Sequence, residues 1–293
     1  MKEYSLPRRI WRIINPLLIY LAITIAVGLI FGISLGVVLV LQNTFGGSGL
    51  DVLDMASEMQ QIIIDYSMEI MITGNVAALA AFIPMWIASR KRLDVTRNVN
   101  PAANYGLTIG LFAAFNLLLV CVFAILDSAI DLMSYFPSYE DLSDVLTEGS
   151  FVAQLISLGV AAPIVEELCF RGIVMERARW LPVWASVLIQ AALFGVAHMN
   201  LFQGSYAFVL GIMLGLIYVK FRSIIIVIVG HAAFNISSVV QSYFEAEPNF
   251  FAILIPGVLI TVVCAILMIK APPAYVLVPV GEVESAELRE ESV

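Results

Sequence analysis

The chain has 293 residues, of which 61% are hydrophobic and 13% are charged, and its mean hydropathy is +0.96. Soluble domains are about 45–50% apolar and about 25% charged, so this composition is typical of an integral membrane protein. The net charge of −8 provides no basic surface for phosphates, and no nucleic-acid partner is expected.

Apolar runs predict eight membrane-spanning helices in an all-α polytopic bundle. The runs lie near residues 15–41, 68–88, 105–126, 151–175, 182–199, 206–220, 224–242 and 250–270, and the sixth is short. Together they predict one integral membrane domain over residues 1–270. Residues 271–293 have little apolar surface to bury and are expected to form a disordered cytoplasmic tail.

The basic residues indicate how the bundle is oriented. Eight spans put both termini on one side, where every Lys and Arg outside a span also falls; only Arg171 lies within a span. The positive-inside rule then places both termini in the cytoplasm of a multi-pass protein of the cell membrane. The long outer segments 43–67 and 127–150 carry acidic residues without Lys or Arg. They are interpreted as interfacial helices or solvated loops, with a gate or substrate-docking role as the alternative.

Five ionisable residues lie well inside the predicted spans: Glu166, Glu167, Arg171, His198 and His231. Insertion scales assign a central Asp, Lys or Arg about 2.5–3.5 kcal/mol, so such groups are expected to face the bundle interior or water. Their place on three spans predicts a single site. Counting about 1.5 Å per residue puts that site near mid-membrane, closer to the cytoplasmic face.

The two glutamates are expected to differ in role. Residues four apart share a helix face, so Glu167 is predicted to form an ion pair with Arg171. Glu166 points about 100° away and is left free for chemistry. Pro163 removes a backbone donor and is predicted to kink or widen the helix beside the site.

The two histidines each have a partner one helical turn away. Phe194 is expected to pack against the His198 imidazole, while His231 and Asn235 direct an imidazole and an amide at one point. Taken singly, each of these residues is explained as readily by packing or by a hydrogen bond between helices as by chemistry.

Together the residues resemble the CPBP intramembrane protease family, which includes the type II CAAX prenyl endopeptidases and bacteriocin-processing and self-immunity proteins. Its motifs EExxxR, FxxxH and HxxxN stand here at Glu166 to Arg171, Phe194 to His198 and His231 to Asn235. The resemblance covers a protease-like core of about 150–240.

The resemblance implies an intramembrane endopeptidase that hydrolyses a membrane-associated or CAAX-type protein or peptide. Glu166 and His198 would activate water, and His231 and Asn235 would stabilise the oxyanion. The structural support would come from Glu167, Arg171 and Phe194. Besides the lipid bilayer and this substrate, no partner is indicated.

The family has been described both as metalloproteases and as metal-independent glutamate proteases. One carboxylate with two imidazoles, here Glu166, His198 and His231, is a ligand set for catalytic zinc, the one cofactor the residues suggest. The sequence lacks HExxH, and we favour the glutamate mechanism.

Two other function classes fit the composition. One is a non-enzymatic membrane scaffold or immunity factor of the same fold. The other is an ion- or proton-coupled transporter, for which inverted repeats would be expected; the N-terminal half has no second glutamate pair and no histidine.

Overall fold

The computed structural model describes residues 4–46, 49–89, 95–97, 102–147, 149–243, 250–271 and 275–277. The N-terminal half contains α1 Leu6–Gly46, α2 Val52–Asp65, α3 Ser67–Ser89, α4 Ala102–Ile130, the 3₁₀ helix η1 Leu132–Tyr135 and α5 Pro137–Thr147. The next span is built from α6 Phe151–Gln154, the π-helix η2 Leu155–Ala161, α7 Ala162–Glu167, the π-helix η3 Leu168–Met175 and α8 Glu176–Ala178. The chain continues through α9 Val183–Ala197, α10 Leu201–Phe221, α11 Ile224–Tyr243 and α12 Phe250–Lys270.

Outside the helices, β1 (Val95–Arg97) pairs antiparallel with β2 (Tyr275–Leu277). The rest of the predicted tail, from residue 278 onward, lies outside the described residues.

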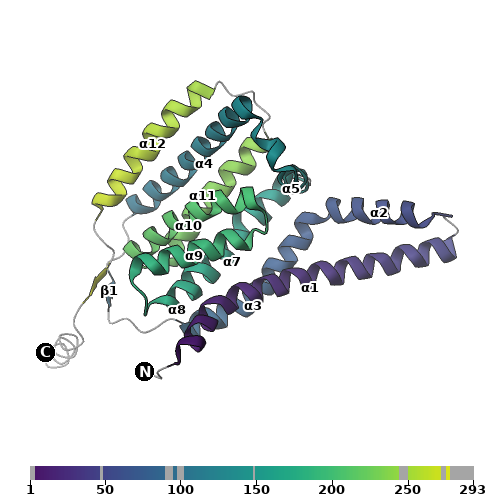
Figure 1. Cartoon of the computed structure of the whole chain (residues 1–293), viewed down its shortest axis with the longest axis horizontal. Helices are drawn as coiled ribbons and strands as arrows, with labels where there is room; N and C mark the ends of the chain where they lie inside the picture. Colours follow the sequence, from purple (N-terminus) through teal and green to yellow (C-terminus); the bar gives the residue numbers. More distant parts are fainter. Residues whose placement is uncertain are drawn as a thin grey trace.

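The all-α polytopic bundle is confirmed. Seven helical segments in the described part of the chain are long and apolar enough to cross a membrane: α1, α3, α4, the continuous segment 151–178, α10, α11 and α12. Most of these helices pack into one body, in which α4 lies between α12 and α11 (Figure 1).

The fifth predicted span, 182–199, is the short apolar helix α9, which is not among these seven. Its 15 residues rise only about 22 Å, less than the roughly 30 Å of a bilayer core. The prediction that the sixth span is the short one is wrong, because α10 has 21 residues. Asn200 caps α10 by accepting a hydrogen bond from the Gln203 backbone N–H at 3.0 Å, so the helix begins before the apolar run.

A tight turn joins α9 to α10. Met199 adopts φ 53° at this turn, the left-handed region that β-carbons disfavour. The two helices approach closely at Gly195 and Gly204, where a β-carbon added to Gly195 would lie 2.7 Å from the Gly204 carbonyl oxygen. The turn is held beneath α5, because Asn200 Nδ2 donates to the Ser138 carbonyl at 3.2 Å.

Helices α1 and α2 form an arm that projects from the body (Figure 1). The 41 residues of α1 rise about 60 Å, twice the thickness of a bilayer core. Both long outer segments contain helices, as expected, α2 in the first and η1 with α5 in the second. Their placement at the membrane interface stays a prediction.

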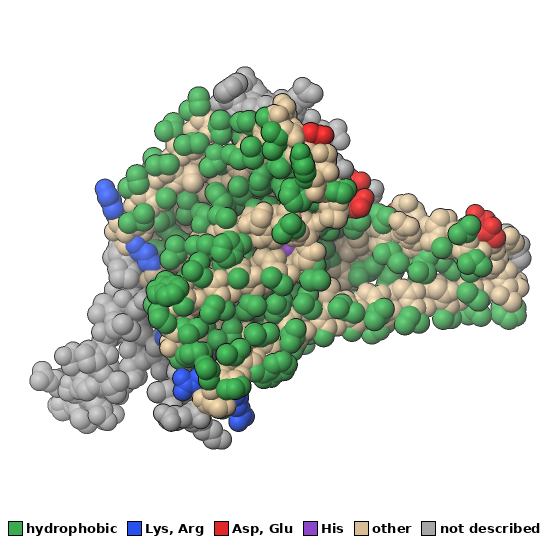
Figure 2. Space-filling model, viewed as in Figure 1, with side chains coloured by type: hydrophobic (Ala, Val, Ile, Leu, Met, Phe, Trp, Pro, Cys, Tyr) green, Lys and Arg blue, Asp and Glu red, His purple; other side chains and the backbone are tan. Residues whose placement is uncertain are grey.

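Charge is segregated along the molecule in the face shown in Figure 2. Lys and Arg lie at the end where α12 finishes, while Asp and Glu lie near α5 and at the tip of the arm. The separation that the sequence predicts is therefore present. The assignment of the basic end to the cytoplasm stays a prediction.

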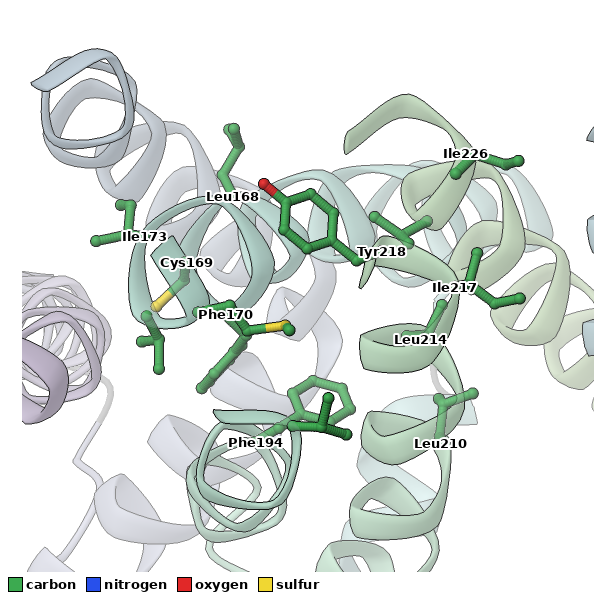
Figure 3. Packing of buried hydrophobic residues seen from close by; sticks show 14 of the residues in the cluster. Leu168, Cys169, Phe170, Ile173, Phe194, Leu210, Leu214, Ile217, Tyr218 and Ile226 are labelled. Carbon is green, nitrogen blue, oxygen red and sulfur yellow. The ribbon is translucent and has the colours of Figure 1, made fainter. Parts of the chain in front are cut away.

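The core is centred on η3, all of whose residues are buried. Its side chains pack with those of α9, α10 and α11 (Figure 3), including Leu168, Phe170, Ile173, Phe194, Leu214, Ile217 and Ile226. Cys121, Cys169 and Cys264 are free and buried. This packing fixes the segment that carries both glutamates.

Candidate active site

The site helix is widened on both sides of the glutamate pair. Glu166 and Glu167 end α7, which lies between the π-helices η2 and η3. Such π-helical turns occur frequently at functional sites. The widening predicted beside Pro163 is thus present.

Pro163 also frees an acceptor. The Ala162 N–H donates to the carbonyl of Ser157, five residues earlier. In the same π-helical pattern, the N–H of residue 163 would donate to the Leu158 carbonyl. Proline has no N–H to make it. The Leu158 carbonyl instead accepts a hydrogen bond of 2.8 Å from Asn235 Nδ2. The break in the helix therefore orients the asparagine of the third motif.

Glu167 lies at the centre of a buried ion network. Its Oε1 is 2.7 Å from Arg171 Nη1 and 2.8 Å from His231 Nδ1. Glu167 and Arg171 are fully buried, and His231 is 2% exposed. The ion pair predicted from the four-residue spacing is present. The bond to His231 was not predicted, because it joins α7 to a helix more than sixty residues later.

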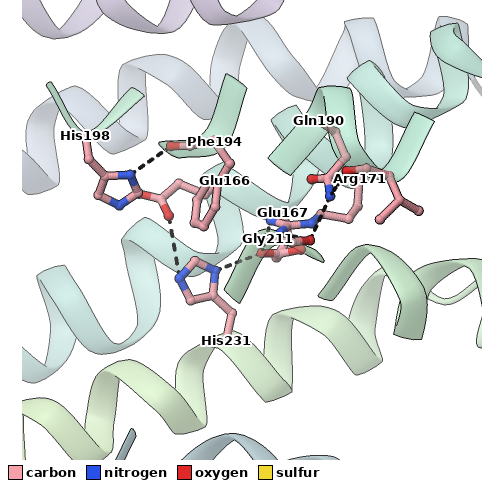
Figure 4. Close-up of polar contacts among 9 residues, drawn as sticks. Glu166, Glu167, Arg171, Gln190, Phe194, His198, Gly211 and His231 are labelled. Atoms are coloured by element: carbon pink, nitrogen blue, oxygen red, sulfur yellow. Dashed lines mark hydrogen bonds and ion pairs between the residues drawn. The ribbon is translucent and has the colours of Figure 1, made fainter. Parts of the chain in front are cut away.

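His231 stands between the two glutamates (Figure 4). Its Nδ1 contacts Glu167, and its Nε2 is 3.6 Å from Glu166 Oε2. Glu167 is already paired with Arg171 and accepts from His231 Nδ1, so Nε2 is the ring nitrogen left facing Glu166.

His198 is fixed by its own helix. Its Nδ1 lies 2.8 Å from the Phe194 carbonyl oxygen, and because a carbonyl only accepts, Nδ1 must carry the proton. In the neutral ring Nε2 is then free to accept. The Phe194 ring packs edge-on against both imidazoles, with centroids 4.9 Å from His198 and 5.6 Å from His231. The expected packing of Phe194 is present.

The sequence did not predict two supporting residues, Gly211 and Gln190. Arg171 Nη2 donates to the Gly211 carbonyl at 3.3 Å, and Gln190 Nε2 donates to the same oxygen at 2.7 Å. The Arg171 guanidinium also lies 4.8 Å from the centre of the Phe194 ring. Gln190, a fully buried amide in an apolar helix, was the available signal. These contacts tie the ion network to α9 and α10.

The motif residues meet at one cavity of about 480 Å³, lined by Glu166, Phe194, His198, His231 and Asn235 among others. The structure therefore brings all four predicted catalytic residues together. A histidine is visible from outside in Figure 2, in the hollow beside the arm.

The cavity extends toward α5, through Tyr139, Ser143 and Thr147. That is the acidic end of the molecule, whereas the sequence count placed the site closer to the basic, cytoplasmic end. The count used rise per residue alone, and it took no account of how the helices tilt and pack.

The candidate zinc ligands do not form a metal site in this arrangement. Among the described residues, no group of three or more His, Cys, Asp or Glu side chains is placed to hold a metal ion. Glu166, His198 and His231 nevertheless line the same cavity.

Residues 148–237 match the family model described as type II CAAX prenyl endopeptidase Rce1-like. This segment is similar to that family. It covers under a third of the chain and contains all three motifs, whereas α1, α3, α4 and α12 lie outside it. The Rce1-like match points to a CAAX-type membrane protease. No curated protein and no solved structure matches the chain significantly.

Proposed function

We propose that the protein is an intramembrane endopeptidase that uses Glu166 and His198 to activate water against a peptide bond of a membrane-associated or CAAX-type substrate. The observation that carries the proposal is the single cavity lined by one carboxylate, two imidazoles and one amide. This set supplies a base and oxyanion donors, the groups that amide hydrolysis needs.

Glu166 is the better placed of the two glutamates to act as a base. Its side chain is 13% exposed, whereas that of Glu167 is fully buried and holds Arg171 and His231. Water in the cavity can reach Glu166 and be held by the free Nε2 of His198.

His231 and Asn235 are suited to stabilise the oxyanion. One proton of Asn235 Nδ2 is used by the Leu158 carbonyl, and the second remains for substrate. His231 can donate through Nε2 when that nitrogen carries a proton. One oxyanion donor typically lowers the barrier by about 2.7–4 kcal/mol.

The reaction balances without a further reagent. The water oxygen attacks the scissile carbonyl carbon while Glu166 takes a water proton, and the carbonyl oxygen becomes an oxyanion held by His231 and Asn235. As this intermediate collapses, the carbon–nitrogen bond breaks and Glu166 returns the proton to the leaving amine. The direct products are a carboxylic acid and an amine, and transfer of the acid proton to the amine gives a carboxylate and an ammonium group.

Purified protein incubated with an internally quenched, farnesylated CAAX-type peptide and with a membrane-protein library tests the proposal. Wild type is expected to cleave at least one of them, and Glu166→Gln and His198→Ala to lose at least about 100-fold in rate. Glu58→Gln, on the exposed α2, serves as the control and should behave as wild type. Equal cleavage by all four proteins would show that the site is wrongly assigned. No cleavage of either substrate by folded wild type would favour the scaffold.

A further inference from the structure

Asn75, in the middle of α3, is a buried amide without a partner. The residue is 3% exposed, and its Nδ2 has no hydrogen-bond partner among the described residues. Nearly all buried polar groups in folded proteins are paired, so an exception requires an explanation. The need is greater in a membrane-spanning helix, where water is scarce.

The position of Asn75 supplies the explanation. Asn75 lines the same cavity as Glu166 and His198, and Met71, one turn earlier on α3, lines it too. Helix α3 packs against η2 and α7, the part of the chain that carries Glu166. The free amide therefore belongs to a wall of the candidate active site that lies outside the Rce1-like segment.

We propose that Asn75 is a substrate-positioning residue whose Nδ2 donates a hydrogen bond to a backbone carbonyl of the bound peptide. This inference rests on the proposed function. An extended peptide offers carbonyl acceptors along its length, whereas lipid acyl chains offer none. None of the described residues that line the cavity is Lys or Arg, so the lining favours a neutral acceptor over an anionic headgroup or carboxylate.

A hydrogen bond from Asn75 to the substrate has a consequence that a purely structural asparagine would lack. In the free protein the Nδ2 donor is unsatisfied, so Asn75→Leu, which is similar in volume and has no donor, leaves thermal stability unchanged or raises it. With substrate the same change removes a hydrogen bond made in both the bound and the transition state. It therefore raises KM and leaves kcat nearly unchanged.

Asn104 on α4 provides a matched control. It is 4% exposed and its Nδ2 is also without a partner in the described structure, but it does not line the cavity. Asn104→Leu makes the same chemical change in the same kind of environment. It is expected to leave KM and kcat at wild-type values.

The test measures KM, kcat and melting temperature for wild type, Asn75→Leu, Asn75→Gln and Asn104→Leu with the internally quenched, farnesylated CAAX-type peptide. We expect Asn75→Leu to raise KM by roughly 3- to 10-fold, the range for one neutral hydrogen bond. Asn75→Gln, which keeps the donor, should recover part of the loss. A wild-type KM for Asn75→Leu, or an equal rise for Asn104→Leu, would overturn the inference.

The two proposals fail separately. Loss of cleavage in Glu166→Gln tests the proposed function and does not depend on Asn75. Binding of the same peptide is compared between Glu166→Gln and Glu166→Gln with Asn75→Leu, without turnover. A roughly 3- to 10-fold weaker affinity of the double variant supports the inference whether or not the peptide is cleaved, and equal affinity overturns it.

Discussion

Arg171→Met is expected to destabilise the protein strongly while it tests the division of roles between the glutamates. Arg171 is fully buried and contacts Glu167 at 2.7 Å and the Gly211 carbonyl at 3.3 Å. Methionine keeps an unbranched apolar chain but leaves the Glu167 carboxylate buried with His231 as its remaining partner. Removing one partner of a buried ion pair costs about 3–5 kcal/mol.

The size of this effect separates it from that of a partly exposed ion pair. At about 2–4 °C per kcal/mol, the melting temperature of Arg171→Met should fall by on the order of 10 °C. Arg179 is the control: it pairs with Glu176 at 2.9 Å but is 20% exposed, and Glu176 keeps Tyr218 and Arg222 as partners without it, so its loss should cost about 1 kcal/mol or less. Arg179→Met should therefore shift the melting temperature by no more than a few degrees.

The assay is thermal unfolding in detergent, followed by tryptophan fluorescence, with turnover measured on the folded fraction. Adding Glu167→Gln to Arg171→Met should recover part of the stability, because the uncompensated charge is then gone. A normal melting temperature in Arg171→Met combined with complete loss of turnover would refute the structural role of Arg171. It would move the arginine into the catalytic chemistry.

Three further predictions concern the oxyanion donor, the α9–α10 turn and the metal. Asn235→Ala should lower kcat by about 10²–10³-fold in a stable protein, as steady-state kinetics would show; a full wild-type kcat would exclude it as a donor. Gly195→Ala should lower the melting temperature, since its β-carbon would meet the Gly204 carbonyl oxygen at 2.7 Å, whereas Gly28→Ala, with nothing within 4 Å, should not. Prolonged treatment with a chelator should leave peptide cleavage unchanged; activity that vanishes and returns with added zinc would establish a metalloprotease.

Local spacing predicted the features that depend on one helix. The four-residue interval correctly paired Glu167 with Arg171 and placed Phe194 against His198. Both contacts depend only on 3.6 residues per turn, a geometry that a membrane helix preserves. The hydropathy of the long spans likewise predicted the helical bundle, because a helix needs a long apolar stretch to cross the bilayer.

Contacts between helices could not be predicted from local spacing or hydropathy. The bond from Glu167 to His231 depends on how α7 and α11 cross, and the sequence gives no crossing angle. The early start of α10 at Leu201 was hidden because Gln203, Gly204 and Ser205 lower the local hydropathy. These residues lie near the start of α10, so the apolar run begins later than the helix. This end of the helix is packed against α9 and α5.

Asn75 is a second case in which the sequence does not predict the contacts between helices. A single amide in an apolar span is most simply interpreted as making a hydrogen bond to a neighbouring helix. Only the packed structure shows that its Nδ2 has no partner among the described residues and that the residue lines the cavity. The motifs indicate the candidate catalytic groups, whereas the other walls of the cavity are set by tertiary packing.

Hydrolysis in ¹⁸O-labelled water tests the central claim most directly. Wild-type protein in liposomes, incubated with the farnesylated CAAX-type peptide, is expected to yield a product whose new C-terminal carboxylate carries one ¹⁸O atom by mass spectrometry. Glu166→Gln, folded to the same melting temperature, should yield none. Labelled product formed at the wild-type rate by Glu166→Gln would contradict the account, because water would then be activated without that carboxylate.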